Sequence, residues 1–430
     1  MYNIEPAKVY VFESVWEDER CATRATRMVK ALGDPEVVNI GDVDIPDIIR
    51  DNNLVNVPAR GNSIPLGESP VFVLNRLRFD GAQSKEEVES ILSKCPEGTR
   101  PHIIQRLLGR SYTGCGGPIR NRELICRRTH EFHTIDGCLH RCLYCSSSAN
   151  QYVTLAMNLE EFVEEKLDKI VKDNPWQKVF RYQTQVSDAL CFEPEYGAGE
   201  VFTNYFAGLD DRYLIFHTSS ANVDHLLDLD HKGHTIVLWS LTSDTVSKEI
   251  EVCSGTTEER IEAARKCQDA GYTVRFKFKP IVPVKNWREE CADMIEKLFA
   301  ATDPDVLSLC VMMWMTPEEF DKLFDPSMFD PKYVKAVHDS ADEMRSRPCG
   351  PFPDEVRTEI YSFFIDEIRK HNSSVPVSLS TETKELWDIL GPKLGFTAEN
   401  YVCGCGAKCT PRLQVLDPPE VLYSATAGKK

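Results

Sequence analysis

Hydrophobic positions in the first part of the chain change between two periods. Residues 8–14 (KVYVFES) and 69–79 (SPVFVLNRLRF) contain the dense apolar runs that are typical of strands. Between them, residues 17–32 place apolar side chains at the spacing of a helix. The pattern therefore predicts a small α/β unit over residues 1–82.

Predicted strands and helices alternate from residue 130 onward. Apolar runs that predict strands lie at residues 130–136, 178–185, 213–219, 235–241, 273–283 and 305–313. Between these runs, residues 158–173 have a helical period, and residues 256–271 open with a capping box from Thr256 to Glu259. Strand–helix units in series predict a parallel sheet, and a curved sheet of this kind is a partial barrel with its chemistry at the carboxyl ends of the strands.

The predicted protein is of the α/β class and has five parts. They are a small α/β unit at 1–82, a helix and connecting loop at 83–129, a partial (β/α)6 barrel at 130–315, a mostly helical region with a Cys-rich metal motif at 316–416, and a disordered tail at 417–430. No internal repeat and no low-complexity tract interrupts this organisation.

Composition narrows the functional classes. The 430 residues are 42% hydrophobic and 27% charged. No apolar run approaches the roughly 18 residues that span a bilayer, and a signal-peptide pattern is missing, so we expect a cytoplasmic protein without a membrane partner. In a reducing cytosol the 16 cysteines are metal ligands or core residues rather than disulfides. The net charge of −17 argues against a large nucleic-acid surface and favours a small-molecule or peptide substrate.

Three cysteines follow the first predicted barrel strand at the spacing C-x3-C-x2-C: Cys138, Cys142 and Cys145. A structural zinc site closes all four coordination positions, whereas three thiolates leave one position open. Three thiolates can bind three irons of a [4Fe–4S] cube and leave the fourth iron free for another ligand. Tyr144 precedes the last cysteine, where a flat ring can stack on a purine. A structural zinc site is the competing interpretation.

This spacing, with an aromatic residue before the last cysteine and a strand–helix series around it, resembles the radical S-adenosylmethionine (SAM) superfamily. The resemblance implies a [4Fe–4S] cluster whose free iron binds the amino and carboxylate groups of SAM. Reductive cleavage then yields methionine and a 5′-deoxyadenosyl radical that takes a hydrogen atom from the substrate. It also implies an electron donor such as a reductase, a flavodoxin or a ferredoxin.

A longer stretch is similar to spore photoproduct lyase and its relatives. The similar blocks include V-D-H-L-L at 223–227 and A-A-R-K at 263–266, and the resemblance covers residues 5–80 and 130–300. The family therefore reinforces the expectation of a radical SAM partial barrel behind a small leading α/β unit.

The same resemblance implies a set of SAM-binding residues. Ser187 and Asp188 would hold the amino end of SAM after the second barrel strand. Ser240 and Thr242 would lie near its carboxylate and ribose after the fourth strand, and the family usually has asparagine where Thr242 stands. Taken alone, each serine or threonine would be read as a solvated loop residue, and only the resemblance assigns it to SAM.

Three positions depart from the lyase pattern. In the lyase a cysteine before the Ser-Asp pair returns a hydrogen atom to the product radical, and this chain has Gln185 at that position. Ser146 replaces a tyrosine after the third cluster cysteine, and Ser219 replaces a lysine after the third barrel strand. We therefore expect the radical-generating half to be kept and the substrate chemistry to differ. Cys191 is a candidate for a displaced hydrogen donor, with a buried structural thiol as the alternative.

Arg275, Lys277 and Lys279 alternate along one predicted strand and so share one face. Three inward cations would line a polar cavity and pair with a carboxylate or phosphate, unless they lie on an exposed sheet edge. We take Arg275 and Lys277, with Cys191, as catalytic candidates and Lys279 as a cofactor-binding candidate.

A second cysteine group, Cys403, Cys405 and Cys409, has the spacing C-x-C-x3-C in a Gly-rich turn. Metal binding is the natural interpretation, by structural zinc or an auxiliary iron–sulfur cluster. The candidates for a fourth ligand are Cys349, Cys310, Cys115, Cys126 or a partner subunit.

The leading hypothesis is a radical SAM enzyme of the spore photoproduct lyase-like family that acts on a small molecule or peptide. One alternative is a lyase that repairs a DNA or nucleotide lesion, and another is a non-catalytic iron–sulfur or zinc scaffold. The sequence names neither the substrate nor the outcome of the reaction, and it leaves the oligomeric state open.

Overall fold

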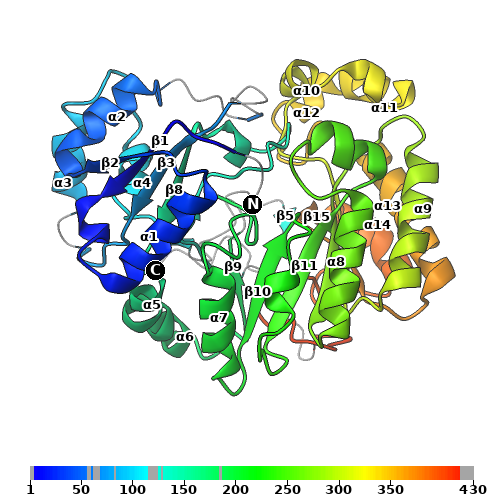
Figure 1. The fold of residues 1–430 in the computed structure, drawn as a ribbon. Helices are drawn as coiled ribbons and strands as arrows, with labels where there is room; N and C mark the ends of the chain where they lie inside the picture. The colour runs from blue at the N-terminus through cyan, green and yellow to red at the C-terminus, as the bar shows by residue number, and fades with distance from the viewer. Residues whose placement is uncertain are drawn as a thin grey trace, which may run out of the picture.

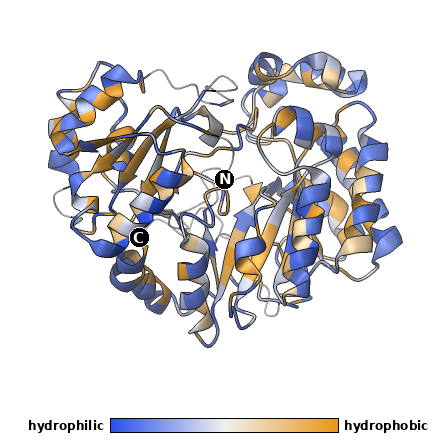
Figure 2. Cartoon of the chain, viewed as in Figure 1, coloured by the Kyte–Doolittle hydropathy of each residue, from blue (hydrophilic) through white to orange (hydrophobic). Residues whose placement is uncertain are grey.

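The computed structural model describes residues 4–55, 60–61, 68–81, 84–114, 124–126, 129–183 and 186–416. Two mainly parallel sheets form its framework, with helices packed around them (Figure 1). Hydrophobic residues concentrate on the strands, whereas the helices contain both hydrophilic and hydrophobic residues (Figure 2). No helix among these residues has the length and apolar character that crossing a bilayer requires.

The larger sheet has eight strands and contains the predicted barrel. In spatial order they are β14 (Val377–Leu379), β13 (Leu307–Val311), β12 (Thr273–Ile281), β11 (Thr235–Leu241), β10 (Tyr213–Thr218), β9 (Val179–Tyr182), β6 (Glu131–Phe132) and β4 (Thr113–Gly114). All neighbours are parallel except β4 and β6. The predicted α/β class and the partial barrel are confirmed, and β14 extends the sheet beyond the six predicted strands.

The smaller sheet has five strands and belongs to the N-terminal unit. Its order is β2 (Glu36–Ile40), β1 (Lys8–Phe12), β3 (Val71–Asn75), β8 (Tyr152–Ala156) and β7 (Ile135–Asp136). β8 is buried along its whole length and pairs in parallel with β3. Two further short strands, β5 (Leu124–Ile125) and β15 (Glu382–Thr383), pair antiparallel.

The helices connect and cover these sheets. They are α1 (Glu19–Ala31), α2 (Ile45–Asp51), α3 (Ser84–Leu92), α4 (Pro101–Leu107), α5 (Leu159–Phe162), α6 (Asp168–Asp173), α7 (Ala198–Ala207), α8 (Thr257–Asp269), α9 (Trp287–Ala301), α10 (Pro317–Leu323), α11 (Pro331–Asp339), α12 (Ala341–Met344), α13 (Asp354–His371) and α14 (Lys384–Leu394). The predicted capping box opens α8: Thr256 and Glu259 each accept from the other's backbone N–H. The helix predicted at 158–173 is divided by a π-helical turn at Val163–Leu167.

The run predicted as the first barrel strand contributes to both sheets. Its first half, β6, pairs with β9, and its second half, β7, pairs with β8. The pairing therefore crosses the predicted domain boundary at residue 130, and the chain that leaves β7 starts where the two sheets meet. The domain boundaries themselves stay a prediction, and the tail at 417–430 lies outside the described residues.

The C-terminal Gly-rich turn closes the barrel at the amino ends of its strands. The carbonyl oxygen of Ala407 accepts from the N–H groups of Lys178 and Val179, at the start of β9. The N–H of Gly404 donates to the hydroxyl of Ser308 at 3.0 Å. Cys403, Cys405 and Cys409 are consequently buried rather than exposed.

Candidate functional site

The segment that carries the first three cysteines, residues 138–145, is called the cluster loop here. It leaves β7 at Gly137, whose φ is +96° and where a Cβ would lie 2.3 Å from the carbonyl oxygen of Tyr152. Only glycine fits this conformation and this close approach. Backbone hydrogen bonds of 3.0–3.2 Å then fix the loop, from Leu143 N to Ile250 O, from Cys253 N to His140 O and from Gly61 N to Cys145 O.

Two of the three loop thiols accept a hydrogen bond. The thiol of Cys191 bonds to Cys138, and this bond lowers the pKa of the Cys138 thiol and favours its thiolate. The N–H of Ser147 donates to the Sγ of Cys145 at 3.3 Å. Burial raises the pKa of the Cys142 thiol well above its ordinary value.

The donor set fits a cluster better than a single ion. Among the described residues, no three His, Cys, Asp or Glu side chains converge on a point where they could hold one metal ion. In a [4Fe–4S] cube each thiolate binds a different iron, so the thiols need not converge. Three thiols on one fixed loop beside the barrel, one of them with a lowered pKa, suit such a cluster with one iron left open.

Tyr144 is held by a buried ion pair. Its hydroxyl donates to the carboxylate of Glu251, and burial raises the pKa of this phenol well above its ordinary value. Glu251 pairs with Arg260 at 2.5 Å, with both side chains fully buried. Thr242 also donates to Glu251, at 3.0 Å. Tyr144 and Thr242, two predicted cofactor contacts, therefore meet at one carboxylate.

Asp188 stands on the other side of the cluster loop. Its carboxylate accepts from the Thr218 hydroxyl at 2.8 Å and from the Ser219 N–H at 2.7 Å, and it lies 3.7 Å from the His140 imidazole. The neighbouring Ser187 hydroxyl lies 4.0 Å from the Cys191 sulfur. The predicted Ser187–Asp188 pair thus lies directly beside the cluster loop.

Ser240 lies at the carboxyl end of β11 and contacts a histidine that the sequence did not single out. The Ser240 hydroxyl and the His217 Nε2 are 3.0 Å apart. Burial, with Lys277, Arg181 and Lys279 nearby, lowers the pKa of His217 well below its ordinary value, so that the ring is neutral at pH 7. A neutral imidazole can donate or accept a hydrogen bond here.

The three alternating cations of β12 point into the barrel but have different surroundings. Arg275 pairs with Asp305 at 2.6 Å and donates to the carbonyl oxygens of Gly404 and Thr410, so it anchors the C-terminal turn. Lys277 is 4% exposed and donates to the Cys405 sulfur at 3.0 Å. The competing interpretation, an exposed sheet edge, is wrong for Arg275 and Lys277.

The second cysteine group is packed at the closed end of the barrel. A hydrogen bond with Cys403 and burial raise the pKa of Cys405 to about 12, so it is a neutral thiol at pH 7. Cys126 lies near Cys405, whereas Cys310 and Cys349 belong to a separate buried apolar cluster. Cys115 lies outside the described residues. A second metal site is not shown by this arrangement and stays a prediction.

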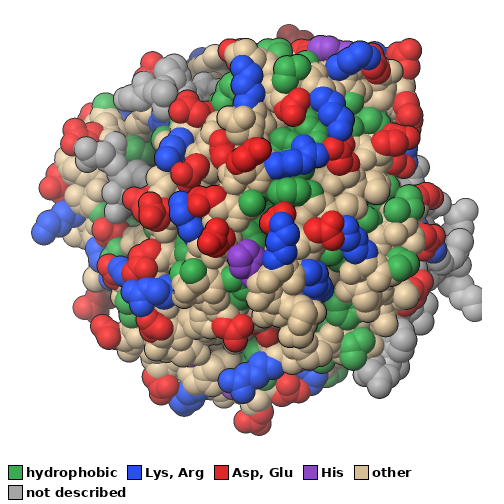
Figure 3. Space-filling model, turned by 90° about the vertical axis from the view of Figure 1, so that its right-hand side faces the viewer, with side chains coloured by type: hydrophobic (Ala, Val, Ile, Leu, Met, Phe, Trp, Pro, Cys, Tyr) green, Lys and Arg blue, Asp and Glu red, His purple; other side chains and the backbone are tan. Residues whose placement is uncertain are grey.

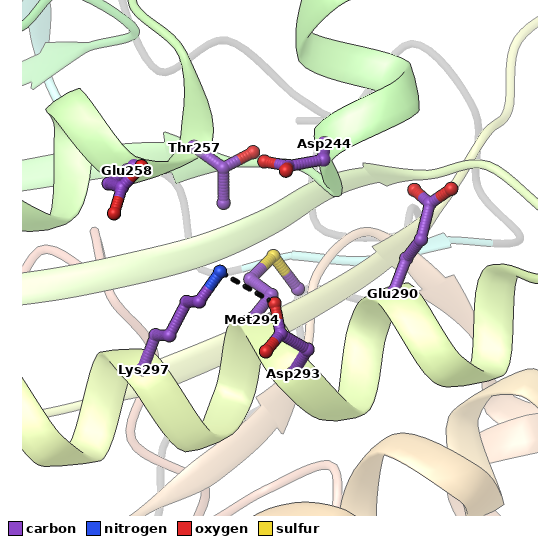
Figure 4. A pocket seen from close by; sticks show the side chains of 7 residues that line it. All are labelled: Asp244, Thr257, Glu258, Glu290, Asp293, Met294 and Lys297. Atoms are coloured by element: carbon purple, nitrogen blue, oxygen red, sulfur yellow. Dashed lines mark ion pairs between the residues drawn. The ribbon is translucent and has the colours of Figure 1, made fainter.

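Sequence reasoning missed the groups that support the site. Glu251, Arg260 and His217 have no motif of their own, and only their tertiary contacts with predicted residues reveal them. The hollow in Figure 4 is distinct from this site: it lies between α8 and α9, lined by Asp244, Thr257, Glu258, Glu290, Asp293, Met294 and Lys297. Gln185, the position of the missing lyase cysteine, lies outside the described residues.

The barrel and the cluster loop lie in the part of the chain that is similar to known proteins. Residues 131–318 match the family model described as spore photoproduct lyase. The chain is 31% identical to the spore photoproduct lyase of Bacillus subtilis (strain 168) over 174 residues, which is 40% of this chain and 51% of that protein. It is 27% identical to the same-named protein of Clostridium acetobutylicum over 224 residues, or 51% of this chain and 62% of that one.

Solved structures agree with these relatives at the level of the fold. A spore photoproduct lyase mutant with bound AdoMet and dinucleoside spore photoproduct superposes with a TM-score of 0.59 at 15% identity, covering 88% of this chain and 99% of that one. The predicted resemblance to spore photoproduct lyase is confirmed. The matched relatives are named as enzymes, which agrees with the prediction of an enzyme. The chain spans about half the length of the first curated relative. The net charge predicted that nucleic acid is not a partner. The comparisons do not support this prediction, because matched structures hold a dinucleoside.

Proposed function

We propose that this protein is a radical SAM enzyme that binds a [4Fe–4S] cluster through Cys138, Cys142 and Cys145. The observation that carries the proposal is the fixed loop of three thiols, in which His140 lies 3.7 Å from Asp188 and Tyr144 is held by Glu251. When bound, the cluster and SAM would supply a 5′-deoxyadenosyl radical after transfer of one electron from a reductase, a flavodoxin or a ferredoxin.

The protein's own residues would bind and orient SAM. Glu251 and Arg260 hold Tyr144 in place beside the last cysteine, where its ring can cover a purine. Asp188 already accepts hydrogen bonds from Thr218 and Ser219, and a carboxylate has further lone pairs for the amino group of SAM. We assign the carboxylate or ribose of SAM to Ser240, which is level with Lys277 across the β11–β12 pairing.

Cys191 is our candidate for returning a hydrogen atom to the product. In that step the S–H bond breaks, a C–H bond forms on the substrate radical, and a thiyl radical remains, which takes a hydrogen atom back from 5′-deoxyadenosine. Its thiol is buried and lies beside Cys138 and Ser187. The alternative of a structural thiol predicts that Cys191→Ala changes stability without changing the products.

The substrate has two candidate classes. A small molecule or peptide agrees with the net charge of −17 and with the face in Figure 3, where acidic and basic side chains are interspersed without a continuous basic surface. A nucleotide lesion is favoured by the relatives, whose structures hold a dinucleoside spore photoproduct. We propose the first class, because a small anionic molecule needs no extended basic surface.

Anaerobic purification tests the proposal. Iron, sulfide and zinc are counted, the protein is reduced with dithionite, SAM is added, and 5′-deoxyadenosine is measured by mass spectrometry. We expect about four irons per chain and deoxyadenosine from the wild type alone, when it is compared with Cys138→Ala/Cys142→Ala/Cys145→Ala. A fully loaded cluster without deoxyadenosine, or zinc in its place, would overturn it.

A further inference from the structure

Lys277 and Lys279 lie inside the barrel without a carboxylate partner among the described residues, whereas Arg275 on the same strand has one. Arg275, Lys277 and Lys279 occupy alternate positions of β12, and Arg275 is neutralised by Asp305 at 2.6 Å. Within the described part of the chain, neither Lys277 nor Lys279 has a carboxylate within ion-pair distance. Their polar contacts are with a thiol, Cys405, and with the ring of Trp314. Unlike Arg275, the two ammonium groups therefore have no carboxylate partner among the described residues.

The groups around these lysines add positive charge. Arg181, on the neighbouring β9, lies close enough to lower the pKa of Lys279 together with burial and Lys277. Glu131 pairs with Arg181 and offsets that one charge. Of the described residues, His217 and the Cys126 and Cys310 thiols also lie near the two lysines. Buried charges without a partner are costly, so a bound anion would stabilise this arrangement.

The position of this cluster connects it to the site. Lys277 is level with Ser240 across the β11–β12 pairing, and the hydroxyl of Ser240 contacts His217. Lys279 lies two residues nearer to the carboxyl end of β12, the end at which such barrels carry their chemistry. An anionic group held by the two lysines would thus lie within the barrel, between Cys405 at its closed end and Trp314 at the carboxyl end of β13.

Trp314 marks the entrance to this position. It follows the carboxyl end of β13, its side chain is 37% exposed, and its ring lies 4.6 Å from the Lys279 Nζ. Its φ of +60° is unusual for a bulky residue, and the backbone is held there by a hydrogen bond to Pro348. An exposed aromatic ring above a half-buried cation suits a ligand that has a flat part and an anionic part.

We propose that Lys277 and Lys279 form an oxyanion subsite for the phosphate or carboxylate of the substrate, with Trp314 against its flat part. This inference deepens the proposed function and rests on it for the identity of the ligand as substrate. The two lysines are binding residues, and Arg275 is not a member of the subsite, since Asp305 and the C-terminal turn occupy it.

Binding of four probes to the anaerobically purified, cluster-loaded protein tests the subsite. The probes are inorganic phosphate, thymidine 5′-monophosphate, succinate and uncharged thymidine, measured by calorimetry and thermal shift at constant ionic strength. We expect at least one oxyanion probe to bind tenfold or more tightly than thymidine. Lys277→Met and Lys279→Met should each weaken that binding about tenfold, the loss of one charge-assisted contact.

The matched control is Lys266→Met, which removes a half-exposed lysine of α8 that pairs with Asp224 outside the barrel. It should leave binding unchanged. Preference for the phosphate probes or for succinate identifies the anion. Lys277→Arg keeps the charge and should keep most of the affinity, so it serves if the methionine variant does not fold.

Two outcomes would overturn the subsite: a wild type that binds no oxyanion, and oxyanion binding that is equal in the wild type and in both methionine variants. Deoxyadenosine formation is measured separately on the same samples. Oxyanion binding without deoxyadenosine would contradict the proposed enzyme and leave the subsite standing, and the reverse result would contradict the subsite alone.

Discussion

The hydroxyl of Tyr144 donates a hydrogen bond to the carboxylate of Glu251. This contact joins the last turn of the cluster loop to a fully buried ion pair, because Glu251 is also the partner of Arg260. The position of the tyrosine ring beside Cys145 is thereby set by a charge pair far from it in sequence.

Removal of Arg260 should destabilise the protein strongly. Arg260→Met leaves Glu251 buried without a partner, and we expect a loss of about 3–5 kcal/mol in the free energy of unfolding. Urea denaturation measures it. Arg265→Met is the matched control on the same helix, since its ion pairs are exposed and should contribute less than about 1 kcal/mol. Equal losses in the two variants would contradict the role assigned to the buried pair.

Loss of the loop thiols should remove the iron. Cys138→Ala/Cys142→Ala/Cys145→Ala is expected to bind no cluster, measured as iron and sulfide per chain and as visible absorbance. Cys267→Ala, a buried thiol of α8, should keep the full iron content. Iron retained in the triple variant would place the cluster elsewhere, and iron beyond that of one cluster in the wild type would support the predicted second site at Cys403, Cys405 and Cys409.

Gly137 should tolerate no side chain. Gly137→Ala forces a Cβ to within 2.3 Å of the Tyr152 carbonyl oxygen, so the loop must move and we expect loss of cluster binding with destabilisation above about 1 kcal/mol. Gly233→Ala is the control, because Gly233 also has a positive φ but no atom within 4 Å of the added Cβ. Gly233→Ala should lower the stability only through backbone strain, because the added Cβ contacts nothing. Equal iron content in both variants would count against the tight turn.

His225 should make the protein sensitive to acid. Burial lowers its pKa to about 4, and among the described residues neither ring nitrogen has a hydrogen-bond partner. The unfolded chain therefore binds the proton first. The stabilising contribution is complete above pH 6.5 and is lost as the pH falls towards 4, by up to about 3 kcal/mol.

His225→Phe should remove this part of the pH dependence, measured as unfolding free energy between pH 7 and pH 4. His371→Phe is the control, because His371 is exposed and stacks on Phe299. A wild-type slope that persists in the His225 variant would assign the acid sensitivity to other groups.

The regular parts of the barrel could be predicted because their signals are local. The strand at 235–241 and the helix of Thr257–Asp269 follow from apolar runs and a capping box, and the cysteine spacing identifies the cluster loop. β8 was missed, since Tyr152–Ala156 is a short run directly after the loop and becomes a strand only by pairing with β3.

The supporting contacts of the site could not be predicted for a related reason. Lys277 and Cys405 are 128 residues apart, and nothing near either of them indicates that a C-terminal turn closes the barrel. Likewise, the alternation of Arg275, Lys277 and Lys279 predicts a shared face, but only the tertiary structure shows that Asp305 neutralises the first and leaves the other two.

The division of one predicted strand between two sheets has a mechanical consequence. β6 is fastened to the barrel and β7 to the N-terminal sheet, with the three-cysteine loop following directly. Any rotation of one sheet against the other would pull on this loop. The N-terminal unit is therefore part of the scaffold that positions the three-cysteine loop, and a shortened chain without it would lose one of the two anchors of this loop.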